Sequence, residues 1–317
     1  MQLYVLNDEE RVGYLNLVSI IMPCYNDGAY LLDAISSLQT QTYTNIELIL
    51  IDDGSTCPES IAALSAASLI EQHKILYTNH LGPSQARNYG IQHARGVYIL
   101  PLDADDKIAP SYIERAVELL DADPQIGAVY CQAELFGDKN GRWDLPAYSL
   151  DSMLLDNIVF VSGVYRKSDW EAIGGYRTTY EHGMEDYDFW LSILELERTI
   201  HQIPEVLFFY RIKPTSRTTQ FMDSIGHVQE TYRLLYANHP TLYNKYRDEY
   251  ATLLRKALIE QSYDRRYLSA ELEKLKARYA FFQLIRERIP YPIKKVAVKI
   301  FRLLSRLLAK KKETIEK

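Results

Sequence analysis

The sequence predicts an α/β fold, in which a mostly parallel sheet is flanked by helices and followed by a helical extension. Short apolar runs alternate with segments of helical spacing through the first third of the chain. Strands that are covered on both faces produce such nearly continuous apolar runs, whereas half-exposed strands alternate between apolar and polar residues. The last third of the chain has an almost wholly helical pattern.

The elements are expected in the following order. The strands are LVSIIMP (17–23), the apolar part of IELILIDDGS (46–55), KILYTN (74–79) and VYILPLDADD (97–106), and the helices between them include AYLLDAISSLQTQ (29–41) and PSQARNYGIQHA (83–94). The pattern is mixed from Gly127 to Tyr210, with short strands expected in GAVYCQ (127–132) and NIVFVSGVY (157–165). Helices follow from about Met222, and Pro290 and Pro292 mark a break.

We therefore expect three segments: an α/β domain over 1–221, a helical extension over 222–289 and a basic amphipathic tail over 290–317. Three widely spaced cysteines show neither a disulfide framework nor a CxxC metal signature, which indicates a reducing compartment. The N-terminus lacks the pattern of a signal peptide, and no apolar run is long enough to span a membrane. A cytoplasmic protein is expected.

The tail has its own charge. Eleven Lys and Arg stand against three Glu from Gln283 to Lys317, whereas acidic residues are in excess elsewhere. At helical spacing, one face would hold Lys295, Lys299, Arg302, Arg306 and Lys310, and the opposite side Val296, Ile300, Leu303, Leu304 and Leu307. Such a helix suits an anionic membrane surface, on the inner face of the cytoplasmic membrane. Packing on the protein's own core is the alternative, and an acidic body argues against nucleic acid.

Three polar clusters each follow an expected strand directly: PCYN (23–26), DDGS (52–55) and DADD (103–106). Ligands of open α/β sheets bind outside the carboxyl ends of the strands, so we expect the clusters to meet at one edge. The crowded carboxylates of DADD repel one another unless a cation neutralises them, and Mg²⁺ and Mn²⁺ prefer such oxygen ligands. The alternative for DADD and DDGS is a turn that also caps a helix.

Two further features are candidates for chemistry. Arg87, in the helix before the DADD strand, would suit a diphosphate, or else a surface salt bridge. Glu185, Asp186 and Asp188 begin an apolar helix in HGMEDYDFWLSIL. Acidic residues there interact well with the helix dipole, but a helix also fixes a carboxylate as rigidly as a general base requires.

SIIMPCYN, ELILIDDGS, ARNYGIQHARGVYILPLDADD, IGGYR and EDYDFWLSI stand in this order along the chain. Together they resemble glycosyltransferase family 2, over roughly Val18 to Thr218. The resemblance implies the Rossmann-like GT-A fold and an inverting glycosyltransferase that uses a nucleotide-diphosphate sugar, most often a UDP-sugar, with Mn²⁺ or Mg²⁺. Surface or lipid-linked polysaccharides, and hence glycan or lipid-linked acceptors, are typical of the family.

The resemblance also implies roles at matching positions. Pro23 and Tyr25 would border the base, with Asn26 nearby, and Asp53 would bond the uracil or ribose. Arg87 would approach the phosphates. Asp105 would be the main metal ligand, and Asp103 would also belong to the metal site, nearer the ribose and the metal-bound water, with Asp106 behind. Asp186 would be the general base, and Glu185 would orient groups in the acceptor site.

The sequence departs from the family pattern in YRIKPTSRT, which has Lys213 where many relatives have a histidine that can reach the metal or the diphosphate. An ammonium ligates no metal at neutral pH, so Arg211, Lys213 or Arg217 would contact the diphosphate instead. The Gln-x-x-Arg-Trp motif of processive relatives is absent, which favours transfer of one sugar per binding event. Two alternatives stay open: a nucleotidyltransferase of similar architecture, and a non-catalytic nucleotide-sugar-binding or scaffold protein.

Overall fold

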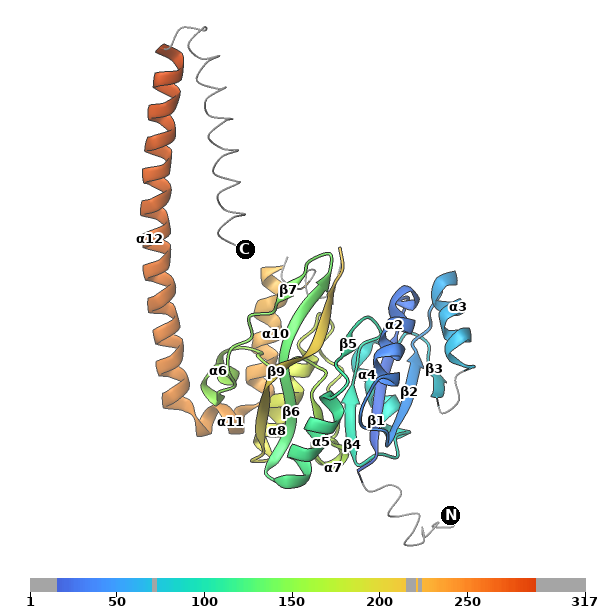
Figure 1. Ribbon diagram of the computed structural model, residues 1–317. Helices are drawn as coiled ribbons and strands as arrows, with labels where there is room; N and C mark the ends of the chain where they lie inside the picture. Colours follow the sequence, from blue (N-terminus) through green and yellow to red (C-terminus); the bar gives the residue numbers. More distant parts are fainter. Residues whose placement is uncertain (1–15, 70–72, 215–220, 222–223, 289–317) are drawn as a thin grey trace, which may run out of the picture. The chain divides into compact units, whose positions relative to one another are not determined.

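The computed structural model describes residues 16–69, 73–214, 221 and 224–288 (Figure 1). The chain divides into two compact units, Met1–Ala251 and Thr252–Lys317. The first unit contains the sheet and most of the helices, including two that lie beyond residue 222. The expected boundaries at residues 221 and 289 stay a prediction, and the expected tail, 290–317, lies outside the described residues.

A nine-stranded sheet forms the centre of the first unit, in the order β3-β2-β1-β4-β8-β6-β9-β5, with β7 paired to β6. The strands are β1 (Val18–Cys24), β2 (Ile46–Asp52), β3 (His73–Tyr77), β4 (Tyr98–Pro101), β5 (Lys107–Ile108), β6 (Ile126–Gly137), β7 (Gly141–Arg142), β8 (Val164–Arg166) and β9 (Thr199–Ile212). The strands β1 to β4 are parallel, as are β6 and β9, whereas β8 and β5 run antiparallel to their neighbours. The predicted mostly parallel sheet is therefore confirmed.

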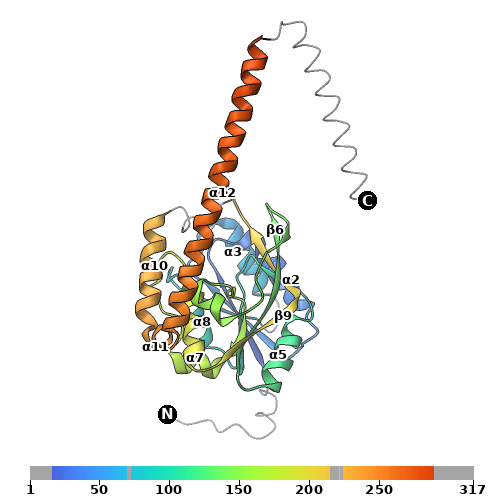
Figure 2. The same cartoon turned by 90° about the vertical axis from the view of Figure 1, so that its left-hand side faces the viewer.

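Helices surround this sheet (Figures 1 and 2). They are α2 (Gly28–Gln39), α3 (Pro58–Ala67), α4 (Pro83–Gln92), α5 (Tyr112–Ala122), α6 (Leu150–Leu155), α7 (Lys167–Ile173), α8 (Glu185–Glu195), α10 (Ile225–Asn238) and α11 (Pro240–Lys245), and α12 (Arg247–Arg288) follows them along the chain. Glycines permit the closest approaches. A Cβ on Gly90 of α4 would lie 2.7 Å from Ile51 of β2, and one on Gly28 of α2 would lie 2.2 Å from the Cα atom of Ser60 in α3.

The apolar run at 157–165 differs from its predicted strand. Only its last two residues are paired, in β8, whereas Ile158, Val159 and Phe160 are buried in a loop. The Val159 carbonyl accepts a hydrogen bond from the Trp190 indole of α8, 3.0 Å away, and the Val159 amide donates to the Asn157 side chain. These contacts satisfy the backbone without a neighbouring strand, so burial alone made the run apolar.

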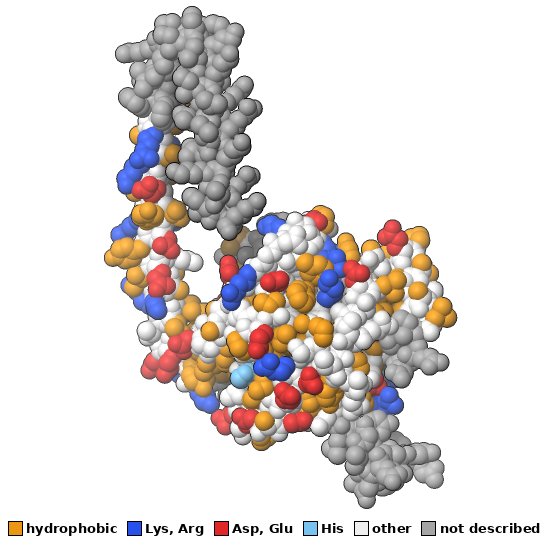
Figure 3. Space-filling model, viewed as in Figure 1, with side chains coloured by type: hydrophobic (Ala, Val, Ile, Leu, Met, Phe, Trp, Pro, Cys, Tyr) orange, Lys and Arg blue, Asp and Glu red, His pale blue; other side chains and the backbone are white. Residues whose placement is uncertain are grey.

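The helix α12 continues from the first unit into the second. Apolar side chains lie exposed along it between charged ones (Figure 3), and Leu268, Leu272 and Leu275 are all more than half exposed. Among the described residues, no helix combines the length and apolarity needed to cross a membrane.

Candidate active site

The carboxyl ends of the parallel strands gather the predicted polar clusters. Cys24 at the end of β1 pairs with Asp52 at the end of β2, and Pro101 of β4 pairs with Ile21 of β1. The residues that follow these strands therefore leave the sheet at the same edge. Backbone hydrogen bonds continue the alignment, since the Asp53 amide donates to the Cys24 carbonyl at 2.9 Å.

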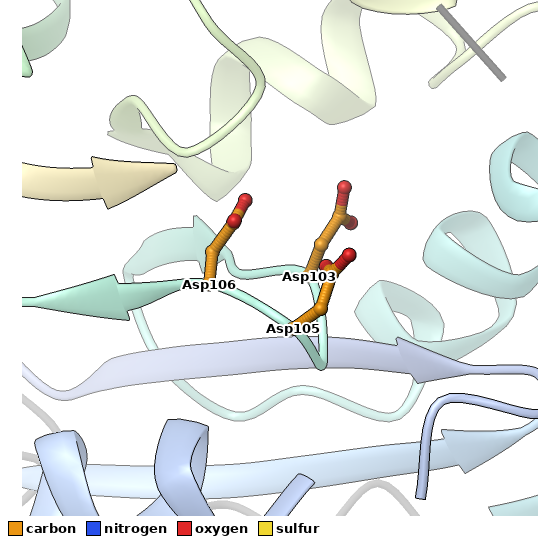
Figure 4. A group of neighbouring side chains, drawn as sticks. All are labelled: Asp103, Asp105 and Asp106. Atoms are coloured by element: carbon orange, nitrogen blue, oxygen red, sulfur yellow. The ribbon is translucent and has the colours of Figure 1, made fainter. Parts of the chain in front are cut away.

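Three carboxylates converge at the end of β4. Oxygen atoms of Asp103, Asp105 and Asp106 lie within 4.8 Å of one another, and all three side chains point to the same side of the loop (Figure 4). Asp106 is buried behind the other two, which stay partly exposed. Burial and the neighbouring carboxylates raise the pKa of Asp105 and, well above its usual range, that of Asp106. A divalent cation would relieve this crowding, so the donor set fits Mg²⁺ or Mn²⁺.

The end of β9 places two cationic residues against this loop. The Arg211 amide donates to Asp106 Oδ1, and its Nε donates to the Asp105 carbonyl, both at 2.8 Å. The Lys213 ammonium lies 2.7 Å from Asp105 Oδ2 and 2.7 Å from Oδ1 of Asp27. Two of the three candidate diphosphate contacts thus lie against Asp105, the main predicted metal ligand, and the third, Arg217, lies outside the described residues. Asp27 was not predicted from the sequence, although it directly follows PCYN.

Arg87 joins the DADD loop to the start of α8. Its guanidinium donates to Asp103 Oδ1 at 2.8 Å and to Glu185 Oε1 at 2.9 Å. The Arg87 side chain is 4% exposed, and its Nε has no hydrogen-bond partner among the described residues. The surface salt bridge considered from sequence is therefore wrong. The expected contact with phosphate stays a prediction, because the structure pairs Arg87 with two carboxylates.

Asp186 occupies the first turn of α8 beside Glu185. Burial and the Glu185 charge raise the pKa of Asp186 to about 6, while Arg87 and the Tyr187 amide oppose the rise. A side-chain hydrogen bond from Asn157 also favours the ionised form. A carboxylate with such a pKa is ionised at neutral pH yet remains basic enough to accept a proton. The sequence did not single out Asn157, because it stands in a loop far away along the chain.

A buried polar network fixes the next carboxylate of α8. Asp188 is 1% exposed and accepts hydrogen bonds from Tyr180 at 2.6 Å and Arg177 at 2.7 Å, with His239 Nε2 at 3.1 Å. Burial opposes ionisation, but hydrogen bonds from His239 and Tyr180 hold the pKa of Asp188 below its ordinary value. Since His239 also contacts Glu195 at the other end of α8, the junction of α10 and α11 anchors this helix.

The predicted nucleotide-base side of the site is built around β1 and β2. The Tyr25 ring is 42% exposed, and its centroid lies 4.1 Å from that of His80. Pro23 lies one position before the end of β1 and is partly exposed. Asp53 accepts three hydrogen bonds from the loop that follows β3: the Thr78 hydroxyl at 2.6 Å, the Leu81 amide at 2.7 Å and the Gly82 amide at 2.8 Å.

Asn26 has a similar structural role. Its side-chain oxygen accepts from the amides of Thr56 and Cys57, at 2.9 and 3.0 Å, and so shapes the start of α3. Contacts of Pro23, Tyr25, Asn26 and Asp53 with a nucleotide stay a prediction. His80 was missed, and the signal that would have found it is its place in TNHLG, directly after the third parallel strand.

Solved structures share this architecture. The structure of S. aureus TarS 1-349 in complex with UDP-GlcNAc superposes with a TM-score of 0.59 at 17% identity, over 70% of this chain and 66% of that one. The mannosyltransferase PcManGT from Pyrobaculum calidifontis, in complex with GDP-Man and Mn²⁺, gives 0.53 at 18% identity, over 77% of this chain and 75% of that one. The GT-A fold expected from the resemblance is confirmed.

Curated relatives match parts of the chain. Protein y4gI of Sinorhizobium fredii is 34% identical over 63% of this chain, and glycosyltransferase GlyG of Streptococcus pneumoniae is 37% identical over 38%. The uncharacterized glycosyltransferase YibD of Escherichia coli is 27% identical over 84% of this chain and 72% of its own length. The chain spans 23% of y4gI and 42% of GlyG. The profile of the family described as "Glycosyl transferase family 2" matches residues 19–184, more than half of the sequence. The chain therefore belongs to glycosyltransferase family 2.

Proposed function

We propose that this chain is an inverting glycosyltransferase that moves one sugar from a nucleotide-diphosphate sugar, a UDP-sugar, to a hydroxyl group of a glycan or lipid-linked acceptor in surface polysaccharide biosynthesis. One observation supports this most: Arg87 bridges Asp103, at the end of β4, and Glu185, beside Asp186. The candidate base is thereby held in a fixed relation to the carboxylates that would face the diphosphate. UDP-GlcNAc in TarS and GDP-Man in PcManGT agree with this donor class.

Asp186 would accept the proton of the acceptor hydroxyl as that oxygen attacks the anomeric carbon. The new bond forms on the face opposite the leaving group while the bond to the diphosphate oxygen breaks, so the anomeric centre inverts in one displacement. The pKa of about 6 suits this base at neutral pH. Glu185, which Arg87 holds in place, would help to orient the acceptor.

Negative charge grows on the departing diphosphate. Asp105 and Asp103 would hold a divalent cation, Mn²⁺ or Mg²⁺, which supplies electrostatic stabilisation of that charge when it is bound. Arg211 and Lys213 add two positive charges to the same loop. Cations that already lie beside the diphosphate when the reaction begins stabilise the developing charge.

The test is release of the sugar from nucleotide-sugars, with and without acceptor. Asp186→Asn removes the proton acceptor and keeps the shape, so we expect transfer to fall by about 10²–10⁴-fold. Binding of UDP should stay unchanged. The matched control is Glu118→Gln, an exposed position of α5, which should transfer at the normal rate. If Asp186→Asn transferred sugar at the full rate, Asp186 would not be the general base.

We propose in addition that the protein is cytoplasmic and binds an anionic membrane surface through its basic tail. The tail lies outside the described residues, so the support is its sequence pattern and charge. Deleting the residues after Tyr291 should release the protein from vesicles that contain anionic lipid, measured by co-sedimentation. Vesicle binding that survives the deletion would contradict the proposal.

A further inference from the structure

The carboxylate of Asp105 already has a cation. Lys213 Nζ lies 2.7 Å from Asp105 Oδ2, an ion-pair distance with no room for a metal ion between the two atoms. A divalent cation of the size of Mg²⁺ binds carboxylate oxygens at about 2.0–2.1 Å. A metal ion bound to Asp105 would therefore lie close to the ammonium that donates to Oδ2 of the same carboxylate, and the two positive charges would repel each other.

Several contacts hold the ammonium in this position. Lys213 Nζ also lies 2.7 Å from Asp27 Oδ1 and 5.6 Å from the centre of the Tyr30 ring. The preceding backbone is fixed, because Ile212 pairs with Gly137 of β6 and the Arg211 amide bonds to Asp106. The side chain is 21% exposed, so the ion pair is shielded from much of the solvent.

The other two carboxylates of the triplet are paired differently. Asp103 bonds to Arg87, which Glu185 also holds and which is 4% exposed, so this pair is the harder to open. Asp106 accepts a backbone amide and lies behind the others. Lys213 is more exposed, and its side chain has four rotatable bonds. Among these three partners, Lys213 is thus the one that can move aside.

We propose that the Lys213 ammonium is a built-in counter-cation of Asp105, which competes with the divalent metal and keeps metal affinity low until a diphosphate is bound. The inference rests on the proposed function, from which it takes Asp105 as a metal ligand. A bound diphosphate adds negative charge and oxygen ligands. It can therefore accept the displaced ammonium and recruit the metal together, so metal and nucleotide bind cooperatively.

The test measures Mn²⁺ binding to the full chain by electron paramagnetic resonance, first without nucleotide. We expect Lys213→Met to bind Mn²⁺ at least tenfold more tightly than the unaltered protein. The matched control is Lys107→Met, next to the same loop, where the ammonium lies over the Phe136 ring at 4.3 Å. It removes the same charge and should change Mn²⁺ affinity much less. Adding Asp105→Asn to Lys213→Met should abolish the gain.

Lys213→Gln is a second variant in case Lys213→Met does not fold, and thermal unfolding shows whether each variant is folded. Equal or weaker Mn²⁺ binding by folded Lys213 variants, or no binding by any variant, would overturn the inference. So would a gain of the same size in Lys107→Met, which would indicate a general charge effect.

The second measurement adds UDP. We expect UDP to tighten Mn²⁺ binding to the unaltered protein, and to tighten it less in Lys213→Met. Failure of UDP to bind any variant would count against the proposed function, while the nucleotide-free comparison would still stand.

Discussion

Arg87 is the residue on which the two acidic motifs depend. Its guanidinium is buried and compensates both Asp103 and Glu185. Arg87→Met would remove the guanidinium that both carboxylates bind, and breaking a buried ion pair costs about 3–5 kcal/mol. We expect a loss of that size in the free energy of unfolding, measured with urea at neutral pH.

The control for this prediction is an exposed pair. Arg115 and Glu205 lie 3.4 Å apart, with side chains 43% and 50% exposed. Exposed pairs contribute about 0–1 kcal/mol, so Arg115→Met should lose no more than that. Equal losses for the two variants would show that the Arg87 pairs add little to stability.

The raised pKa of Asp186 predicts that the rate of sugar transfer depends on pH. Its pKa is raised to about 6, and a general base is active only when it is deprotonated. We expect kcat/KM to fall as the pH drops below about 6, along a limb with one ionisation. Glu185→Gln removes the neighbouring negative charge that raises this pKa, so the limb should move to lower pH in a steady-state profile. An acidic limb that stays in place would argue that another group titrates.

The sequence could predict residue types at the site better than residue contacts. Asp103, Asp105 and Asp106 were expected to crowd together because they are neighbours in the chain. The pairs of Lys213 with Asp27 and of Arg87 with Glu185 join residues 186 and 98 positions apart. Spacing holds no information about such contacts. The contacts of Asp53 were unpredictable for the same reason, since its three hydrogen-bond donors lie in the loop that follows β3.

At the scale of elements, the contact of α2 with α3 depends on one missing side chain. A Cβ on Gly28 would lie 2.2 Å from Ser60 Cα, which is backbone and cannot turn aside. Overpacking of this kind costs about 1–3 kcal/mol, so Gly28→Ala should be destabilised by that amount in urea unfolding. The added methyl group would also push α2 away from α3, and with it the Asn26 side chain that binds the amides of Thr56 and Cys57.

The matched control is Gly226→Ala in α10. Among the described residues, the atom nearest to a Cβ there would be Ser224 Oγ, 3.9 Å away. Since alanine also favours helix, the variant should be as stable as the parent or slightly more stable. If Gly28→Ala were equally harmless, the close approach of α2 and α3 would not limit stability.

Strand and helix types were predicted best where periodicity was long and simple. The strands β1, β2 and β4 and the helices α2 and α4 lie within a few residues of their expected bounds. The run at 157–165 was predicted wrongly, because a buried loop and a buried strand are equally apolar. The α8 anchor at His239 could not be predicted, since α8 and the α10–α11 junction meet only through tertiary packing.

At the scale of the whole molecule, the order of motifs predicted the fold class and the family. Alternating elements imply parallel strands, and parallel strands imply one edge for the residues that follow them. The order of strands β8, β6, β9 and β5 was not predictable in the same way. Two of these strands have two or three residues, too few for a periodicity to emerge.

Under the proposed function, this edge of the sheet binds a nucleotide-diphosphate sugar. A calorimetric screen of nucleotide-sugars and nucleoside diphosphates, with Mn²⁺ or Mg²⁺ present, tests it most directly. UDP and one UDP-sugar should bind, raise the melting temperature of the protein and lose affinity in Asp105→Asn. Absence of binding by every nucleotide-sugar, or unchanged affinity in Asp105→Asn, would contradict it.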